Sequence, residues 1–507
     1  MIRMTLAEIA EAVGGTLGQD TDGALTVTGP VTVDSRTVEP GGLFAAFVGE
    51  HADGHDFAAS AVERGAVAVL SSRQVTGSGQ SVPAAPTPTV PIPAVPTPAV
   101  PTPTVSIPTV LVEDVQEALG RLARAVLNRL PGTPATGITV IALTGSSGKT
   151  STKDMLGQVL AAHGTTIAPK GSFNNEIGLP LTVLRADEST RYLVLEMGSR
   201  GIGHLKYLCE IAPPSVGLVL NVGTAHVGEF GSKEQTALAK GELVEALPED
   251  GVAVLNADDP LVVAMRSRTA ARVITFGESA DADVRATEIE LGADGRAHFL
   301  LHADRYGEPA PVALRVVGEH QVANALAVAA TALGLGLPLD AVARELSAAV
   351  ALSAGRMAVS ERSDGVVVID DAYNANPESV RAALKALIAL ARARPGARAW
   401  AVLGPMLELG ERSGEEHDAV GRLAVRLGVD RLVAVGEGAA RIHAGASHEG
   451  SWGEESVMVA DPDAALAVVC AELRPGDVVL VKASNSIGLG RIARALLDDV
   501  VSVEGDR

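Results

Sequence analysis

Short apolar segments alternate with amphipathic ones along the chain beyond Gly137. Residues 138–145 form a continuous apolar run, and β-branched runs follow at 192–198, 216–223 and 251–259, each ending in polar residues or glycine. Strands that are apolar on both faces, separated by helical patterns, are typical of a parallel sheet covered by helices. The pattern therefore predicts an α/β region whose first strand lies at 138–145.

The same alternation restarts after Arg356. Apolar runs lie at 365–374, 399–406, 430–438 and 477–486, and a helical segment covers about 377–393. This second α/β unit spans roughly 150 residues, which is a common domain size. At 507 residues the chain is also too long for one hydrophobic core, so we expect two or three domains.

The first residues predict a short helix. Thr5 and Glu8 have the spacing of a capping box, and the amphipathic pattern that follows stops at Gly14 and Gly15. This start lacks the pattern of a signal peptide, and no apolar run reaches the roughly eighteen residues needed to cross a bilayer. We therefore expect a cytoplasmic protein.

A proline-rich segment of almost no charge extends from about residue 73 to 108. Proline at every few positions prevents helix and ladder hydrogen bonds and favours an extended polyproline conformation. Because residues 67–72 and 109–114 both resemble strand ends, the segment is interpreted as a surface insertion between strands. A spacer is favoured over a ligand for a partner protein.

Composition excludes several classes of function. A net charge of −20 argues against a nucleic-acid surface, which needs a broad basic patch. Cys209 and Cys470 are far apart and form no C-x-x-C pair, so neither a disulfide nor a cysteine metal site is expected. An anionic ligand would have to be held by a few Lys and Arg side chains and by backbone N–H groups.

A phosphate-binding loop follows the strand at 138–145. It consists of Gly145, Ser146, Ser147, Gly148, Lys149 and Thr150. Glycines allow backbone N–H groups to approach phosphates, Lys149 neutralises charge, and Thr150 offers a hydroxyl to Mg²⁺. The spacing is shorter than the usual pattern, whose first glycine would fall at Leu143. The strand before the loop and the helix after it still predict that it binds ATP or GTP.

Polar residues at the ends of other strands are further candidates. Glu196 suits a magnesium ion held on nucleotide phosphates, whereas His226 is equally well explained as a hydrogen-bonded loop histidine. In the segment 370–377, an Asx-turn and a helix cap account for Asn376 and Pro377. They leave unexplained Asp370, Asp371, Tyr373 and Asn374.

These motifs, taken in order, resemble the Mur ligases of bacterial cell-wall synthesis, and the resemblance covers essentially the whole chain except the proline-rich insertion. The matching segments are DSR at 34–36, LFAAFVGEHADGHDF at 43–57, LTGSSGKTSTKD at 143–154, GSFNNEIGLP at 171–180, LEMGSRGIGHL at 195–205, NVGTAHVGEFGS at 221–232, AKGEL at 239–243, GEHQVANALAVAA at 318–330, GRM at 355–357, DDAYNANPES at 370–379, LGPMLELGERSGEEH at 403–417 and VLVKASNS at 479–486.

The resemblance implies an α/β protein of three domains. They are a UDP-substrate-binding domain at 1–112, a central ATP-binding domain with a mostly parallel sheet at 113–350, and a C-terminal Rossmann-like domain at 351–507. Its implied cofactors are ATP and Mg²⁺.

The resemblance also implies a role for particular residues. Those expected to contact ATP are Gly145, Ser146, Ser147, Gly148, Lys149, Thr150, Ser151, Asn324, Arg356, Asp370, Tyr373 and Asn374. Those expected to hold magnesium are Thr150, Glu196, His226 and Lys240, the last as a carbamylated lysine. Charge stabilisation and catalysis fall to Lys149, Lys240, His226 and Arg356, and the substrate side to Ser35, Arg36, Asn174 and Asn175.

The implied reaction is the ATP-dependent joining of D-alanyl-D-alanine to UDP-N-acetylmuramoyl-tripeptide through an acyl phosphate. We expect a monomer with no nucleic-acid partner and no membrane span. One rival is the ligase that adds the preceding amino acid, whose D-N-P-R loop has no counterpart here. Folylpolyglutamate synthase fits the segments at 34–36, 173–178 and 370–377 less well. A catalytically idle protein of the same fold would not need the full set of nucleotide and metal positions.

Overall fold

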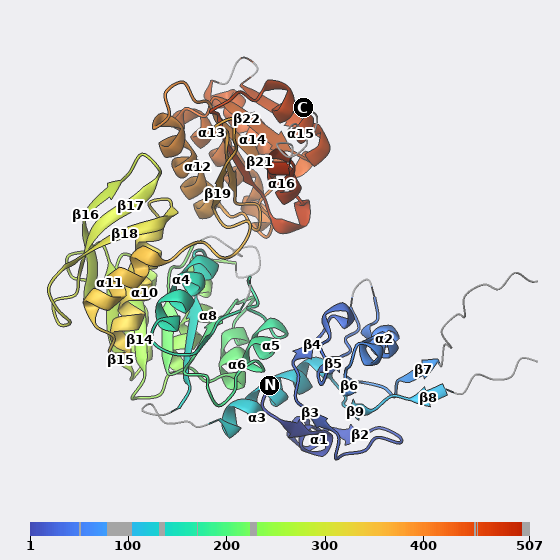
Figure 1. Cartoon of the computed structure of the whole chain (residues 1–507). Coiled ribbons are helices and arrows are strands. Elements are labelled where there is room, and N and C mark those ends of the chain that lie inside the picture. Colours follow the sequence, from blue (N-terminus) through green and yellow to red (C-terminus); the bar gives the residue numbers. More distant parts are fainter. Residues whose placement is uncertain are drawn as a thin grey trace, which may run out of the picture. The chain divides into compact units, whose positions relative to one another are not determined.

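The computed structural model describes residues 1–49, 52–78, 104–130, 137–169, 171–223, 231–450, 453 and 455–498. Contacts between Cα atoms divide the chain into two compact units (Figure 1). The first unit contains residues 1–138 and 176–190, and the second contains 139–175 and 191–507. The first unit therefore extends past the expected domain boundary at residue 112. The candidate His226 lies outside the described residues.

The first unit is built on a small mixed sheet with the strand order β2-β9-β6-β5-β4. Its elements are β1 (Met4–Thr5), α1 (Leu6–Val13), β2 (Thr16–Leu17), β3 (Thr26–Val27), β4 (Val31–Thr32), η1 (Ser35–Thr37), β5 (Leu43–Ala45), η2 (Gly54–Phe57), α2 (Ala58–Glu63), β6 (Ala68–Ser71), β7 (Thr76–Ser78), β8 (Thr104–Ser106), β9 (Thr109–Leu111), α3 (Val115–Arg129) and α5 (Gly178–Val183). The predicted helix at the start is confirmed: Thr5 and Glu8 form the capping box of α1, and Gly14 ends it with φ +71°.

The proline-rich segment 73–108 was expected to be an insertion between strands, and the described residues at its two ends are themselves folded, with strands at Thr76–Ser78 and Thr104–Ser106. Strands β6 and β9 pair in parallel, and β7 pairs with β8 in antiparallel, with Ser78 opposite Thr104. Val75 and Ile107 are buried in the core of the first unit. The flanks of the segment are therefore part of the folded unit, and its centre, 79–103, lies outside the described residues.

The larger sheet of the second unit has the strand order β11-β12-β10-β13-β14-β15-β16-β17-β18. These strands are β10 (Thr139–Thr144), β11 (Thr166–Ile167), β12 (Tyr192–Glu196), β13 (Val216–Val219), β14 (Val252–Asn256), β15 (Arg272–Gly277), β16 (Val284–Leu291), β17 (Arg296–His302) and β18 (Ala310–Val317). Pairing is parallel from β11 to β16 and antiparallel from β16 to β18. The predicted parallel strands are confirmed.

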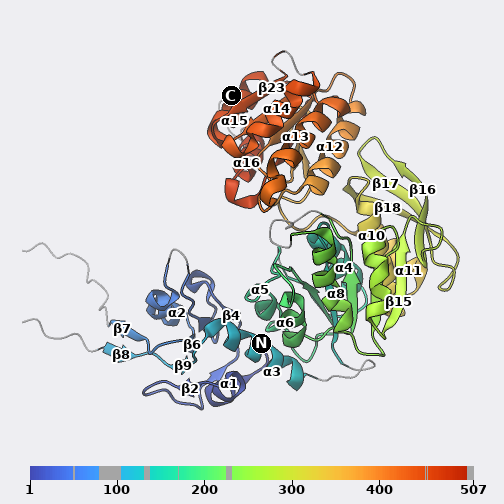
Figure 2. The same cartoon turned by 180° about the vertical axis from the view of Figure 1, so that it is seen from behind.

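Helices cover this sheet (Figures 1 and 2). They are α4 (Lys149–Ala161), α6 (His204–Ile211), α8 (Lys233–Glu245), α9 (Pro260–Val263), α10 (Gln321–Gly334) and α11 (Leu339–Ala348), with the 3-10 turn η3 (Ala264–Arg268). The inner faces of α4, α10 and α11 join the strands in one apolar core made largely of Ala, Val and Leu. Strands β10, β12 and β13 end at the same edge, which places the loops after them side by side.

The second sheet of this unit has the order β19-β20-β24-β21-β22-β23 and is parallel apart from β19. Its elements are β19 (Ala358–Glu361), β20 (Val367–Asp370), α12 (Pro377–Arg392), β21 (Ala399–Leu403), η4 (Gly410–Arg412), α13 (Ser413–Leu427), β22 (Arg431–Val435), η5 (Glu437–Ala439), α14 (Ala440–Glu449), β23 (Ser456–Val459), α15 (Pro462–Glu472), β24 (Val478–Lys482), η6 (Asn485–Ile487) and α16 (Gly490–Asp498).

Successive residues of these strands point to opposite faces, so each face has its own core. One core packs on α12, α13 and α14, and the other packs on α15 and α16. The predicted helix after Asn376 is confirmed, because Asn376 caps α12 and accepts a hydrogen bond from the Ser379 N–H. The arrangement is the expected Rossmann-like sheet covered on both faces.

Candidate active site

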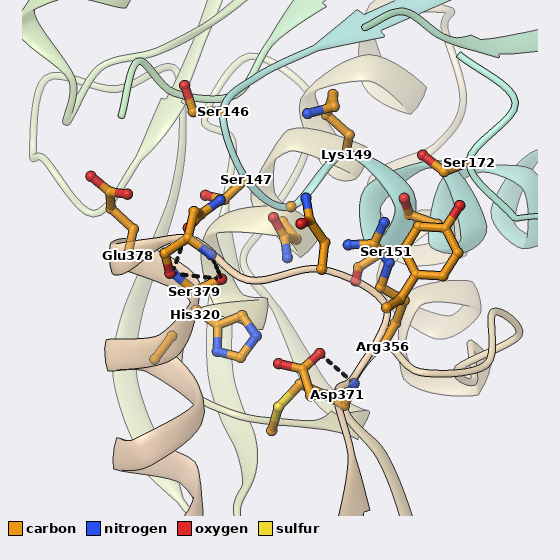
Figure 3. Close-up of a pocket in the computed structure, with 18 of the residues that line it drawn as sticks. Ser146, Ser147, Lys149, Ser151, Ser172, His320, Arg356, Asp371, Glu378 and Ser379 are labelled. Atoms are coloured by element: carbon orange, nitrogen blue, oxygen red, sulfur yellow. Dashed lines mark hydrogen bonds between the residues drawn. The ribbon is translucent and has the colours of Figure 1, made fainter. Parts of the chain in front are cut away.

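One cavity of about 390 Å³ in the second unit collects most of the predicted site residues. The phosphate loop, the start of α10 and the loop between β20 and α12 surround it (Figure 3). Its lining residues include Ser146, Ser147, Gly148, Lys149, Thr150, Ser151, Ser172, Asn174, Glu196, Asn221, His320, Asn324, Arg356, Asp371, Tyr373, Asn374 and Lys482. Residues from distant parts of the chain thus meet at one place.

The phosphate loop has the backbone that its glycines predict. Gly148 has φ +80°, and a Cβ there would come 2.4 Å from the Asn324 side-chain oxygen. Only glycine combines that conformation with that close approach. Asn324 therefore supports the loop from α10, in addition to facing the cavity.

Asn221, which the sequence did not single out, braces the same loop. Its Oδ1 accepts hydrogen bonds from the backbone N–H groups of Ser146 and Ser147, at 3.0 and 2.9 Å. Gly223 donates its N–H to the Ser146 hydroxyl at 2.9 Å. The strand-end segment that begins with Asn221 thus fixes the first half of the loop.

Lys149 begins α4 and donates a hydrogen bond from Nζ to the Gly145 carbonyl at 2.7 Å. Burial lowers the pKa of Lys149, although the nearby carboxylate of Glu196 opposes that effect. The Arg356 guanidinium lowers it further. Two basic groups therefore face one region, which favours an anionic ligand there.

Glu196, at the end of β12, is oriented by two neighbours that both bond to the same carboxylate oxygen. Its Oε1 accepts hydrogen bonds from the Ser172 hydroxyl at 2.7 Å and from the Asn174 Nδ2 at 2.8 Å. Its Oε2 is buried and has no hydrogen-bond partner among the described residues. A buried anionic oxygen without a partner is costly, so this atom fits contact with a cation. Ser172 was not among the predicted site residues. Asn174, which was predicted to contact the substrate, donates its hydrogen bond to the Glu196 carboxylate.

Lys240 is almost completely buried in α8, with 2% of its surface exposed. Burial, and then the positive charge of Lys149, lower the pKa of Lys240 to about 7. Half of such amines are uncharged near neutral pH. Lys240 is not among the residues that line the cavity.

The C-terminal side of the cavity is formed by Arg356 and its neighbours. The Arg356 guanidinium lies 4.3 Å from the centre of the Tyr373 ring, and its Nε is buried without a hydrogen-bond partner in the part of the chain that the structure describes. Asp371 accepts a hydrogen bond from the Met357 N–H at 3.0 Å and pairs with Lys482 Nζ at 2.5 Å. Lys482 also donates to the Asn374 carbonyl at 2.8 Å. This network fixes the loop after β20.

Of the two acids at the end of β20, Asp371 is among the residues that line the cavity and Asp370 is not. The Asp370 carboxylate accepts a hydrogen bond from the Ala372 N–H at 3.2 Å, and burial raises its pKa. Adjacent residues at the end of a strand point to opposite faces, so only one of the two acids can face the nucleotide side.

His320 was also missed. It is the N-cap residue of α10 and lines the cavity, and burial lowers its pKa, so the imidazole is neutral near pH 7. The next residue, Gln321, begins the same helix and accepts a hydrogen bond from the Asn324 amide at 2.9 Å.

Ser35 and Arg36 belong to the first unit. Asp34 caps the turn that they form, and its carboxylate pairs with Arg36 at 2.8 Å. The Arg36 side chain holds the pKa of Asp34 at about 2. Asn175 closes the first segment of the second unit.

In the described part of the chain, no group of three or more His, Cys, Asp or Glu residues is arranged to hold a metal ion by itself. Among the same residues, no helix is both long enough and apolar enough to cross a membrane.

A phosphate loop at the carboxyl edge of a parallel sheet, facing a Rossmann-like domain, defines a nucleotide-binding α/β protein. Three family models match: the Mur ligase family catalytic domain at 29–126, the Mur ligase middle domain at 143–332, and the Mur ligase glutamate ligase domain at 355–485. The chain belongs to the Mur ligase family.

Particular members of the family are similar over nearly the whole chain. UDP-N-acetylmuramoyl-tripeptide–D-alanyl-D-alanine ligase of Mycobacterium tuberculosis H37Rv is 51% identical, over 98% of each chain. The enzyme of that name from Escherichia coli K12 is 32% identical, over 98% of this chain and 99% of its own. A crystal structure of MurF from Acinetobacter baumannii has a TM-score of 0.80 at 31% identity and covers 98% of this chain and 99% of its own.

Proposed function

We propose that this protein is an ATP-dependent ligase that joins D-alanyl-D-alanine to UDP-N-acetylmuramoyl-tripeptide, a step in peptidoglycan precursor synthesis. The observation that carries the proposal is the single cavity in which the phosphate loop faces Arg356, Tyr373 and Asp371. Similarity to ligases of that name over 98% of the chain supports the choice of substrates. A MurF structure in complex with ADP, from Thermotoga maritima, has a TM-score of 0.72 at 28% identity, covering 94% of this chain and 99% of its own.

The reaction has two stages. A carboxylate oxygen of the tripeptide attacks the γ-phosphorus of ATP, the bond to the β-γ bridging oxygen breaks, and ADP leaves. The amine of the dipeptide then attacks the carbonyl carbon of the acyl phosphate, loses a proton, and the tetrahedral intermediate expels inorganic phosphate. Protein groups contribute mainly by positioning the reactants and stabilising charge.

Two cations of the chain suit that task. Lys149 belongs to the loop 145–151, whose backbone N–H groups would hold the phosphates, and Arg356 lines the same cavity. When ATP is bound, Lys149 Nζ would donate hydrogen bonds to phosphate oxygens in place of its bond to the Gly145 carbonyl. The Nε of Arg356, which has no partner among the residues described here, gives that side chain a donor for the same oxygens. Tyr373, Asn374 and Asn324 would contact the remainder of the nucleotide.

Magnesium fits the donors near Glu196. The unpartnered Oε2 of Glu196 and the hydroxyl of Thr150 are hard oxygen ligands of the kind this ion prefers. His226 and Lys240 complete the set we propose, with Lys240 carbamylated. A pKa of about 7 leaves much of Lys240 as the neutral amine, the form that reacts with carbon dioxide. When bound, Mg²⁺ neutralises charge on the phosphate oxygens.

The remaining proposals concern the substrate side and the organisation of the chain. Ser35, Arg36, Asn174 and Asn175 would contact the UDP-linked substrate. We propose that residues 1–112 bind the UDP substrate, 113–350 bind ATP, and 351–507 form the C-terminal domain. The protein would work as a monomer in the cytoplasm.

An acceptor-specificity assay tests the function. ADP release is measured with ATP, UDP-N-acetylmuramoyl-tripeptide and one acceptor at a time: D-alanyl-D-alanine, D-glutamate or diaminopimelate. A parallel reaction offers a folate with glutamate. We expect ADP only when the tripeptide and D-alanyl-D-alanine are both present. Turnover with another acceptor instead of the dipeptide would refute the assignment.

A further inference from the structure

Helix α4 does more than present the phosphate loop at its first turn. Its next two turns hold the segment 350–355, here called the linker, which leads from α11 to Arg356. Asp154 and Gln158, four residues apart on one face of α4, make these contacts. Helix α4 therefore contributes Lys149 to the site directly, and it also holds the linker that leads to Arg356.

Gln158 bonds to the linker in both directions. Its Nε2 donates a hydrogen bond to the Val350 carbonyl at 2.9 Å, and its Oε1 accepts one from the Val350 N–H at 3.0 Å. The second hydrogen of Nε2 goes to the Asp154 carbonyl at 2.9 Å. The amide is thereby fixed to its own helix and to one peptide unit of the linker.

Asp154 makes the second attachment. Its Oδ2 accepts a hydrogen bond from the Ser353 N–H at 3.1 Å, and its Oδ1 pairs with Lys153. Lys153 is itself buried and donates to the Pro169 carbonyl at 2.7 Å. Because this carboxylate is buried and held by a buried cation, its position is fixed independently of the linker.

On the other side, Arg356 is attached to the C-terminal domain by both of its neighbours. Gly355 accepts a hydrogen bond from the Tyr373 N–H at 3.2 Å, and Met357 donates one to Asp371 at 3.0 Å. Only Ala354 separates Ser353, held by α4, from Gly355, held by the loop after β20. The backbone that carries Arg356 is thus held by hydrogen bonds to α4 on one side and to the loop after β20 on the other, which leaves it little freedom to move.

These bonds contribute little to the stability of the fold. Gln158 is half-buried and Val350 is exposed, so water can replace the bonds between them. A hydrogen bond that water can replace adds little to the free energy of folding. Its larger effect is geometric, because it selects one path of the linker among those an exposed segment would otherwise sample.

We propose that Gln158 and Asp154 are positioning residues that hold the linker on α4 so that Arg356 faces the phosphates of ATP. The proposal rests on the nucleotide role of the cavity argued above. Neither residue contacts the reacting atoms; both act through the position of Arg356.

The test uses the full-length enzyme and the substitution Gln158→Met, which keeps the length of the side chain and removes its hydrogen bonds. We expect kcat/KM for ATP to fall about tenfold, as for the loss of one or two such bonds, while KM for D-alanyl-D-alanine changes less than twofold. The matched control is Gln74→Met in the first unit. Gln74 also holds backbone in both directions, accepting from Gln19 N–H at 2.9 Å and donating to the Val75 and Ile107 carbonyls. The Gln74→Met variant should have the same kcat and KM for ATP as the wild type.

A double-mutant cycle with Arg356→Ala separates positioning from general damage. If Gln158 acts through Arg356, then Gln158→Met has no further effect on kcat/KM for ATP once Arg356 is replaced. A full tenfold loss in that background would overturn the proposal, as would normal ATP kinetics in the single Gln158→Met variant. Normal ATP kinetics in Arg356→Ala would overturn the nucleotide role of Arg356 itself and the positioning role with it. Melting temperatures of all variants, with Gln158→Ala as a second truncation, confirm that the fold is kept.

Discussion

Asn324 occupies the space in which a side chain on Gly148 would lie, with its oxygen 2.4 Å from the ideal Cβ position. The two residues come from the start of α4 and from α10, so this contact joins the phosphate loop to a helix more than 170 positions later in the chain. The fit between them sets the shape of the loop.

Gly148→Ala should therefore disable nucleotide binding. The added methyl group meets Asn324, and the left-handed backbone at φ +80° costs a further ~1 kcal/mol for a residue other than glycine. We expect kcat/KM for ATP to fall at least a hundredfold. Gly396→Ala is the matched control, since Gly396 has the same φ and no atom of the described residues lies within 4 Å of its ideal Cβ position. An equal loss in both variants would show that backbone strain alone, and not the contact, matters.

Glu196→Gln tests the proposed magnesium ligand. The amide oxygen can still accept from Ser172 and Asn174, so the local structure and the melting temperature should persist. Because the negative charge is lost, the Mg²⁺ concentration for half-maximal activity should rise by about tenfold or more. The measurement is a magnesium titration at saturating ATP. An unchanged titration curve would remove Glu196 from the metal site.

Lys240→Met should stabilise the fold in a pH-dependent way. The pKa of Lys240 is about 7 in the folded protein, against 10.5 for an ordinary lysine side chain such as that of the unfolded chain. Between these values the unfolded chain binds a proton that the folded chain does not, so stability of the wild type rises with pH by about 1.4 kcal/mol per unit. The variant lacks this dependence. Its melting temperature should exceed that of the wild type most at pH 6 to 7 and least near pH 10.

The Lys240 comparison is made in bicarbonate-free buffer, so that carbamylation does not contribute. Lys233→Met, an exposed lysine on the same helix, serves as control and should show no such trend. A difference in melting temperature between the Lys240 variant and the wild type that is constant from pH 6 to 10 would contradict the burial of a titrating amine.

Replacing residues 79–103 with an Asn-Gly turn tests the insertion. Ser78 and Thr104 face each other across β7 and β8, and a two-residue Asn-Gly loop suits such a hairpin. We expect activity within twofold of the wild type. Removing 74–108 instead should unfold the first unit, because Val75 and Ile107 belong to its core. Lost activity in the short replacement, with the fold intact, would assign a function to the proline-rich segment.

Much of the fold follows from local pattern. Strands that are apolar on both faces, such as residues 140–143, predict a parallel sheet. Asn376 followed by Pro377 predicts the start of α12. Strands β16 to β18 were not recognised, because alternate residues such as Glu288 and Arg315 face solvent and break the apolar run. An antiparallel strand with one wet face has no continuous apolar signature.

The site was predictable where a motif carries its own chemistry, as with Lys149 and Glu196. Ser172, Asn221 and His320 have no such signature, since each acquires its role only from a partner distant in sequence. The choice of Asp371 over Asp370 depends on which face of β20 each residue takes. That parity follows from the register of the sheet and not from the two adjacent acids themselves.

Strand β24 is inserted between β20 and β21, and its last residue, Lys482, bonds to both Asp371 and Asn374. A ribosome makes this strand more than a hundred residues after the loop that it anchors. During synthesis, the phosphate loop and Arg356 are therefore made long before Lys482, the residue that holds the loop after β20. The growing chain therefore contains every strand of the nine-stranded sheet before β24, the strand that anchors the loop after β20, has been made.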